Sequence, residues 1–318
     1  MRIDVHAHYF PGDYMDCLAR LGHPDARAAV LRAPGGQMPL DERMALLDRT
    51  GVDLQVLSPA AAVPYLEEQA GAVEAARTLN DAFAALCRQY PGRFAAFASL
   101  PMPHVEAALA EIARCLDTLG MVGVTLGCSV LGRQLDDPAF EPLYAELDRR
   151  GSVLFLHPVG AGAGPGSADY GIRWMVGAPV EDAVAALRLT LSGLTTRYAR
   201  MRVIVPHFGG FLPFLLERLN DEAEREGHAG IRPAVSTPPS ELVKGLWFDT
   251  VNCHPAALRC ACESFGAGRI MLGTDFPYLA GERFERAVEY IADAGLSEAE
   301  TAAIYGGNAQ ALLGIGSA

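Results

Sequence analysis

Two histidines lie two residues apart at the end of the first apolar run of the chain, in the segment IDVHAH at positions 3–8. On a β-strand, residues two apart point to the same face, so the imidazoles of His6 and His8 are expected side by side. Burying such a pair at the end of an apolar strand is costly unless something binds its nitrogens. Neutral imidazole is the commonest metal ligand, so the spacing favours a metal site over a satisfied pair of core histidines.

Three later apolar runs also end in a residue that could bind a metal or move a proton. These residues are His157, His207 and Asp275, in the segments LFLHP, VIVPH and MLGTD. Each one alone could be an ordinary strand-end histidine or a turn-starting aspartate. Their repetition at corresponding places predicts that they share one site with the histidine pair. The remaining histidines are expected in loops or at helix starts, as surface or capping residues: His23, His104, His228 and His254.

The residues that could do chemistry lie on runs that predict strands. Eight such runs occur: Arg2–His8, Val52–Ser58, Phe94–Leu100, Val122–Gly127, Ser152–His157, Arg202–His207, Leu246–Val251 and Arg269–Thr274. Several are continuously apolar, which is typical of parallel strands covered on both faces. Helices are predicted between them: Asp41–Thr50, Glu67–Tyr90, Val105–Leu119, Pro138–Arg150, Pro179–Leu194, Leu212–Glu226, Pro255–Phe265 and Glu282–Ala294.

This alternation predicts an α/β fold. A doubly wound sheet is the alternative, but no G-x-G-x-x-G or P-loop segment opens a β-α unit, so a closed (β/α)8 TIM barrel is favoured. A chain of 318 residues suits one such barrel, and we expect a single domain over residues 1–318. The long irregular stretches Tyr9–Leu40, Val159–Gly171 and Gly227–Ser240 are expected as insertions at the C-terminal face, where barrel active sites lie.

Composition excludes several classes of protein. With 50% hydrophobic residues the chain can bury a large core, and its net charge of −12 disfavours nucleic-acid partners. We find no apolar run long enough for a membrane span and no signal-peptide pattern at the N-terminus. Seven scattered cysteines match no zinc pattern and are expected as reduced thiols. A cytoplasmic enzyme acting on a small molecule is the resulting expectation.

The chain resembles the metal-dependent amidohydrolase superfamily, in particular the group related to aminocarboxymuconate semialdehyde decarboxylase. The resemblance rests on IDVHAH at 3–8, FLHP at 155–158, PHFGGFLPF at 206–214, GTDFP at 273–277 and GNAQALLG at 307–314, and it spans nearly the whole chain. It implies that one divalent metal, zinc with manganese as the second choice, is bound by His6, His8, His157 and Asp275. It also implies that His207 stays off the metal as an acid/base.

The lysine content favours one metal over two. Many two-metal members of the superfamily bridge their ions with a carboxylated lysine at the end of the fourth strand, whereas the segment 122–127 here is VGVTLG. The chain has a single lysine, Lys244, which lies before the seventh predicted strand. A mononuclear site with a position open for water or substrate is therefore predicted.

The resemblance further implies three substrate-binding residues and a dimer. Arg43 and Arg218 match arginines that bind the substrate carboxylate in the decarboxylase, the second of them from the partner subunit of a homodimer, and Trp174 matches a pocket residue. Arginine suits this task because its fork binds a carboxylate with two hydrogen bonds. The alternative is that both arginines lie on helix surfaces and that the tryptophan packs in the core.

The predicted activity is the non-oxidative decarboxylation of a small unsaturated or cyclic carboxylic acid, with His207 and Asp275 handling protons. The alternative is a hydrolase of a lactone, amide or carbon–carbon bond, because the same ligands serve both reactions. A binding protein with a structural metal is a third class, but it gives His207 no role. Aromatic-acid decarboxylases of the group often carry Glu at the first position of the histidine pair, so the intact pair argues against a salicylate or resorcylate. The glycine-rich stretch Val159–Gly171 is expected as a mobile lid.

Overall fold

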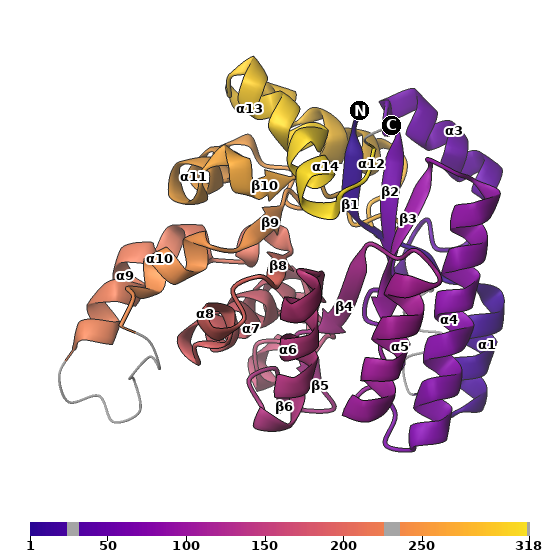
Figure 1. Cartoon of the computed structure of the whole chain (residues 1–318). Helices are drawn as coiled ribbons and strands as arrows, with labels where there is room; N and C mark the ends of the chain where they lie inside the picture. The colour runs from indigo at the N-terminus through magenta and orange to yellow at the C-terminus, as the bar shows by residue number, and fades with distance from the viewer. Residues whose placement is uncertain (24–31, 226–235, 317–318) are drawn as a thin grey trace.

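The computed structural model describes residues 1–23, 32–225 and 236–316, and within them the predicted barrel is confirmed. Eight parallel strands follow one another in chain order around the barrel, with helices outside (Figure 1). The strands are β1 (Ile3–His8), β2 (Leu54–Ser58), β3 (Phe94–Ser99), β4 (Gly123–Gly127), β7 (Val153–His157), β8 (Arg202–Val205), β9 (Trp247–Asp249) and β10 (Ile270–Met271). A separate antiparallel hairpin, β5 (Ser129–Val130) and β6 (Arg133–Gln134), follows β4.

The barrel closes where the chain following β10 meets β1. Val5 donates to the carbonyl of Leu272 at 2.9 Å, and Asp275 donates through its backbone N–H to the carbonyl of His6 at 2.8 Å. These bonds bring the segment after the last strand beside the histidine pair. Asp275 therefore reaches the same end of the barrel as the first strand's site residues.

The predicted helices are present with shifts of a few residues at their ends. The main ones are α3 (Leu40–Thr50), α4 (Gln69–Gln89), α5 (Val105–Asp117), α6 (Glu141–Arg150), α7 (Ala178–Leu191), α9 (Leu212–Glu224), α11 (Pro255–Phe265) and α12 (Glu282–Glu289). Shorter helices are α8 (Leu194–Arg197), α10 (Pro239–Lys244), α13 (Glu298–Ala302) and α14 (Asn308–Leu313). Among the described residues, no helix is long and apolar enough to cross a membrane.

The sequence did not predict α1 (Gly12–Arg20) or the shorter helices α8, α10, α13 and α14. The stretch Tyr9–Leu40, expected to be irregular, contains α1, which packs beside α4 (Figure 1). Its buried residues Tyr14 and Leu18 are one helical turn apart, a pattern too short to stand out in a stretch rich in glycine and proline. Parts of two expected loops and His228 lie outside the described residues.

The inner face of β1 depends on a one-residue irregularity. Asp4 pairs with Gln55, but the next pair along the strands is Ala7 with Leu57, so β1 contains one extra residue between them. Inside this irregular segment, Val5 packs in the barrel interior with residues such as Phe155. Its neighbour His6, and His8 beyond the segment, also face the interior. A bulge of this kind lets one strand change which residues face inward.

Candidate active site

Four of the predicted residues meet at the C-terminal end of the barrel. His6 and His8 come from β1, His157 ends β7, and Asp275 follows β10. One ligand atom from each of the four lies within 4.8 Å of the ligand atoms of the others. The carboxylate of Asp275 contacts both histidines of β1, with Oδ1 2.9 Å from Nε2 of His8 and 3.4 Å from Nε2 of His6.

The cluster fits a divalent cation. Nε2 of His6 and Nε2 of His157 are buried and have no hydrogen-bond partner among the described residues, which is costly unless another group binds them. The other nitrogen of each ring is fixed from behind. Nδ1 of His6 lies 2.6 Å from Oδ2 of Asp249, Nδ1 of His8 lies 2.8 Å from Oγ of Ser58, and Nδ1 of His157 lies 2.8 Å from the Pro158 carbonyl. Such outer partners are the usual support of metal-binding histidines.

Burial and charge set different protonation states for the ring nitrogens. Burial alone would lower the pKa of His6, but the carboxylates of Asp249 and Asp275 outweigh it and raise this pKa to about 10. Burial lowers the pKa of His8 to about 4 and that of His157 well below its ordinary range. Burial opposes ionisation of Asp275, but the hydrogen bonds and charges of the β1 histidines hold its pKa well below the usual value. At neutral pH, the metal-free cluster therefore carries one imidazolium, His6, beside the ionised carboxylate of Asp275.

His207 lies next to the cluster but belongs to a turn, not to a strand. The expected strand Arg202–His207 ends at Val205, and His207 begins a short turn with φ of 53°. The strand ends before its predicted limit because Pro206 has no N–H to continue the ladder. The His207 N–H donates to Oδ1 of Asp249 at 2.9 Å, and its Nδ1 lies 2.8 Å from Oδ2 of Asp182. Its ring centroid is 5.3 Å from that of His6.

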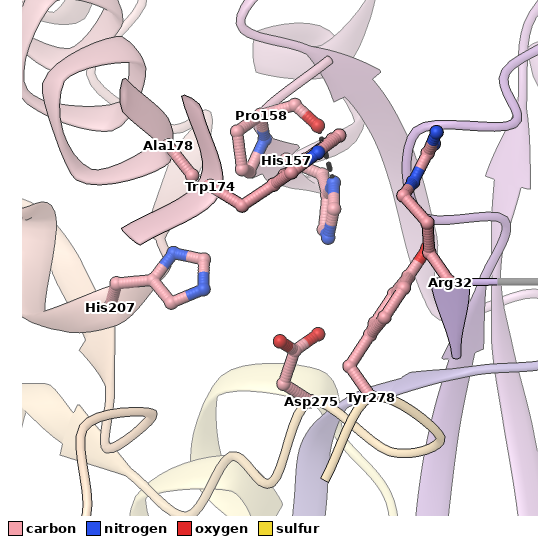
Figure 2. A pocket seen from close by; sticks show the side chains of 8 residues that line it. All are labelled: Arg32, His157, Pro158, Trp174, Ala178, His207, Asp275 and Tyr278. Atoms are coloured by element: carbon pink, nitrogen blue, oxygen red, sulfur yellow. Dashed lines mark hydrogen bonds between the residues drawn. The ribbon is translucent and has the colours of Figure 1, made fainter. Parts of the chain in front are cut away.

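A pocket of about 310 Å³ opens above the cluster. Its lining residues are Arg32, His157, Pro158, Trp174, Ala178, His207, Asp275 and Tyr278. Figure 2 shows His157, His207 and Asp275 converging on one space, with Tyr278 and Arg32 on the side opposite His207. The guanidinium of Arg32 lies over the Trp174 ring, 5.1 Å from its centroid. The pocket thus combines a cation and two aromatic walls with the metal-competent cluster.

The glycine-rich stretch after β7 is tied to the barrel by a carboxylate. Glu181 of α7 accepts hydrogen bonds from the N–H groups of Val159 at 2.8 Å and Gly162 at 3.0 Å. Gly160 has a φ of 81°, and a Cβ there would lie 2.8 Å from the Trp174 ring. The loop backbone therefore packs directly on the indole and supports that wall of the pocket.

The two arginines singled out from the sequence lie elsewhere. Arg43 is 2% exposed, donates to Oε1 of Gln55 at 2.7 and 2.9 Å, and donates to the His8 carbonyl at 2.9 Å. It thus lies behind the strand that carries the histidine pair, where a contact with substrate would require it to leave these partners. Arg218 lies on α9, has a side chain that is 72% exposed, and pairs with Glu222 at 3.6 Å.

Four residues of the site were not predicted from the sequence: Arg32, Tyr278, Asp182 and Asp249. Asp249 ends β9 and lies where a strand-end signal could have found it, because WFD closes an apolar run as LFLH does. Arg32 and Tyr278 lie in segments without periodicity. Asp182 lies near the start of α7, one residue after the first-turn acid Glu181, where acidic residues are common because of the helix dipole.

Comparisons with known proteins agree with this geometry. The family model described as Amidohydrolase matches residues 3–315. The 2-amino-3-carboxymuconate-6-semialdehyde decarboxylase of Dictyostelium discoideum is 30% identical over 99% of this chain and 92% of that protein. The gamma-resorcylate decarboxylase of Rhizobium sp. is 30% identical over 86% of both chains. The chain therefore belongs to this amidohydrolase family.

A solved structure also superposes over the whole barrel. The dihydroxybenzoic acid decarboxylase of Polaromonas sp. JS666, with bound manganese and the inhibitor 2-nitroresorcinol, has a TM-score of 0.83 and 27% identity, covering 100% of this chain and 98% of that one. That protein holds a divalent metal on the same fold. The buried cluster of three histidines and one aspartate supports a single divalent metal here too.

Proposed function

We propose that the protein is a metal-dependent, non-oxidative decarboxylase of a small unsaturated or cyclic carboxylic acid. One observation carries the proposal: two members of the four-residue metal-competent cluster, His157 and Asp275, line one pocket together with a separate histidine and an arginine. The named relatives act as decarboxylases, which favours this reaction over hydrolysis on the same scaffold. A hydrolase remains the second outcome of the test described below.

The metal would be held by His6, His8, His157 and Asp275, with zinc as our first choice and manganese as the second. When bound, a divalent cation supplies positive charge that stabilises the electrons left behind as carbon dioxide departs. The donor set of imidazoles and one carboxylate suits either ion. Because the four ligand atoms come from three strand ends, the barrel fixes their mutual positions before the ion arrives.

The substrate would lie between the cluster and the aromatic walls. Arg32 is placed to bind its carboxylate, and the faces of Trp174 and Tyr278 suit a flat ring or conjugated chain. We assign substrate contact to Arg32 in place of Arg43, whose guanidinium bonds Gln55 and the His8 carbonyl. The pocket volume of about 310 Å³ suits a substrate with a single ring.

The chemistry would proceed by proton transfer and bond cleavage. The bond between the ring carbon and the carboxylate carbon breaks, and its electron pair stays on the ring carbon. His207 delivers a proton to that carbon from Nε2, the ring nitrogen on the side away from Asp182. Asp275, which lies beside both β1 histidines, would relay the proton that restores the site for the next turnover.

We further propose a cytoplasmic homodimer in which Arg218 reaches the partner's pocket. On α9, Phe214 is 86% exposed one turn before Arg218, so an apolar and a cationic group stand together on the surface. Two-fold homodimers are the commonest closed assembly. Mixing Arg218→Ala with His207→Ala protein should restore part of the lost activity through hybrid sites. Failure to complement, once subunit exchange is verified by labelled chains, would show that Arg218 does not act in trans.

The reaction is tested by metal analysis followed by a substrate panel. Protein reconstituted with zinc or with manganese is incubated with acids labelled with ¹³C in the carboxyl group, including conjugated semialdehydes, salicylates and resorcylates. Release of labelled carbon dioxide, lost in the chelated protein and recovered on adding metal, would support the proposal. Turnover of lactones or amides with no release from any acid would instead favour the hydrolase.

A further inference from the structure

A buried carboxylate lies behind the imidazole of His207. Asp182 follows the first turn of α7, is wholly buried, and has Oδ2 2.8 Å from Nδ1 of His207. Its other oxygen, Oδ1, lies 3.5 Å from the thiol of Cys128. These are the two side-chain partners of this carboxylate in the described structure. In Figure 2 the ring of His207 projects into the pocket toward Asp275, with its second nitrogen on that side.

The backbone holds the two residues at this distance. The turn that begins at His207 is seated directly on the start of α7, because a Cβ at Gly210 would collide with the carbonyl of Pro179. The N–H of His207 is bonded to Asp249, which fixes the turn from the other side. The contact between Asp182 and His207 is thus set by packed main chain and not by two flexible side chains.

The neighbouring acid shows what a purely structural carboxylate does here. Glu181, the preceding residue on α7, bonds two backbone N–H groups of the loop after β7. Within the described part of the chain, Asp182 bonds no backbone group but faces an imidazole and a thiol. Burying a carboxylate is costly, and a single neutral thiol is a weak partner, so the imidazole is its main source of stabilisation.

We propose that Asp182 is a positioning residue that keeps the proton of neutral His207 on Nδ1 and so presents Nε2 to the pocket. An ionised carboxylate only accepts hydrogen bonds, so Nδ1 must be the donor. Nε2 is then the atom that takes up and gives away a proton at the substrate, and the ring cannot rotate without breaking the bond. The inference rests on the proposed role of His207 as the acid/base of the decarboxylase.

The effect on protonation agrees with the geometry. Burial tends to lower the pKa of His207, but the charge and hydrogen bond of Asp182 outweigh it and raise this pKa above its usual value. The same arrangement, a carboxylate behind a histidine, orients the acid/base imidazole in other enzymes, where the aspartate-to-asparagine exchange costs about 10⁴ in turnover through the wrong tautomer.

The direct test is the tautomer of His207 in the zinc-loaded protein. The protein is labelled with ¹⁵N in histidine, and the His207 signals are identified by their loss in His207→Ala. As the pH is raised, we expect the neutral native ring to keep its proton on Nδ1, and the neutral ring of Asp182→Asn to carry it on Nε2. A native ring with an unprotonated Nδ1 would overturn the inference without any reference to activity, and without requiring a variant of Asp182 to fold.

Steady-state kinetics provide a second test of the role of Asp182. Asp182→Asn should lower kcat by about 10²–10⁴ while KM stays within about threefold and the metal content is unchanged. The double variant with His207→Ala should be no slower than His207→Ala alone, because residues that act as a unit are not additive. Thr190→Val, a buried change on the same helix that removes a hydroxyl bonded to the Ala186 carbonyl, should leave kcat unchanged.

Two kinetic results would overturn the inference. One is a kcat within threefold of native in Asp182→Asn, and the other is an equal loss in Thr190→Val, which would indicate general damage to α7. A protein that releases no carbon dioxide from any acid but shows the expected tautomer change refutes the proposed reaction and leaves the positioning role intact. Failure of the proposed reaction can therefore be distinguished from failure of the positioning role of Asp182.

Discussion

The Nδ1 atom of His6 lies 2.6 Å from Oδ2 of Asp249, and both side chains are completely buried. The same carboxylate accepts the N–H of His207 through its other oxygen, at 2.9 Å. One aspartate therefore orients a residue of the metal-competent cluster and the backbone of the proposed acid/base. This link explains why the end of β9 belongs to the site although it offers no ligand.

Asp249→Asn should weaken metal binding by about 10–100-fold, the range for losing an outer partner of a metal-binding histidine. The amide keeps an oxygen that can accept from His207, so the turn should be preserved. Ser58→Ala, which removes the neutral partner of His8, should have a smaller effect. Competition with a chromogenic chelator measures both. A native affinity in Asp249→Asn would contradict the role assigned to this carboxylate.

Metal binding at neutral pH should release about one proton per ion. The pKa of His6, raised to about 10, keeps this ring protonated in the metal-free protein, and that proton must leave before Nε2 can bind. The pKa of His8, lowered to about 4, leaves that ring already neutral. Apparent affinity should therefore rise about tenfold for each unit of pH between 6 and 9. Calorimetry in buffers of different ionisation enthalpy counts the protons, and zero or two would contradict these assignments.

His207→Ala should keep its metal while turnover falls by about 10²–10⁴. His6→Ala and His8→Ala should lose both metal and activity, because each removes one of the cluster's donors. Elemental analysis beside steady-state kinetics separates the two behaviours. We expect about one divalent ion per chain in the native protein. A metal-free His207→Ala protein would make His207 a ligand, and two ions per active chain would refute the mononuclear site.

Arg32 and Arg43 should respond differently to loss of charge. Arg32→Gln should raise KM by about 10–100-fold with little effect on stability, as expected for a charge-assisted bond to a carboxylate. Arg43→Gln should instead lower the free energy of unfolding by about 2–4 kcal/mol, because it leaves the His8 carbonyl and Gln55 without a buried donor. Chemical denaturation measures the change in the free energy of unfolding, and substrate titration measures the change in KM. Equal effects on KM would contradict this division.

The eight strands and the metal-competent cluster were predictable because their signals are local or follow from the fold. A continuous apolar run marks a buried parallel strand wherever it stands, and the carboxyl ends of such strands meet at one end of a barrel. His157 and Asp275 could thus be placed together from sequence although they are far apart along the chain. The helix boundaries near glycines were predictable for the same reason, since Gly51 and Gly151 end α3 and α6 with positive φ.

The remaining parts of the site depend on contacts that no local pattern records. Arg43 carries the residue type of a carboxylate clamp, but the packing of α3 behind β1 decides that it supports the strand. Asp182 lies just past the first turn of α7, a place that carries no signal of its own, and only the fold of the turn at His207 brings an imidazole to it. Arg32 reaches the pocket from a part of the sequence without hydrophobic periodicity, and its guanidinium lies over the Trp174 ring.

The extra residue in β1 makes the metal cluster sensitive to the length of one short strand. With strict alternation along β1, the neighbours Val5 and His6 could not both face the barrel interior. Deleting one residue between Asp4 and Ala7 would therefore turn either the interior apolar residues of β1 or its two histidines outward, toward the helices. The loops above the barrel are under no such constraint. In this architecture, substrate preference can diverge through insertions and deletions while the first strand tolerates neither.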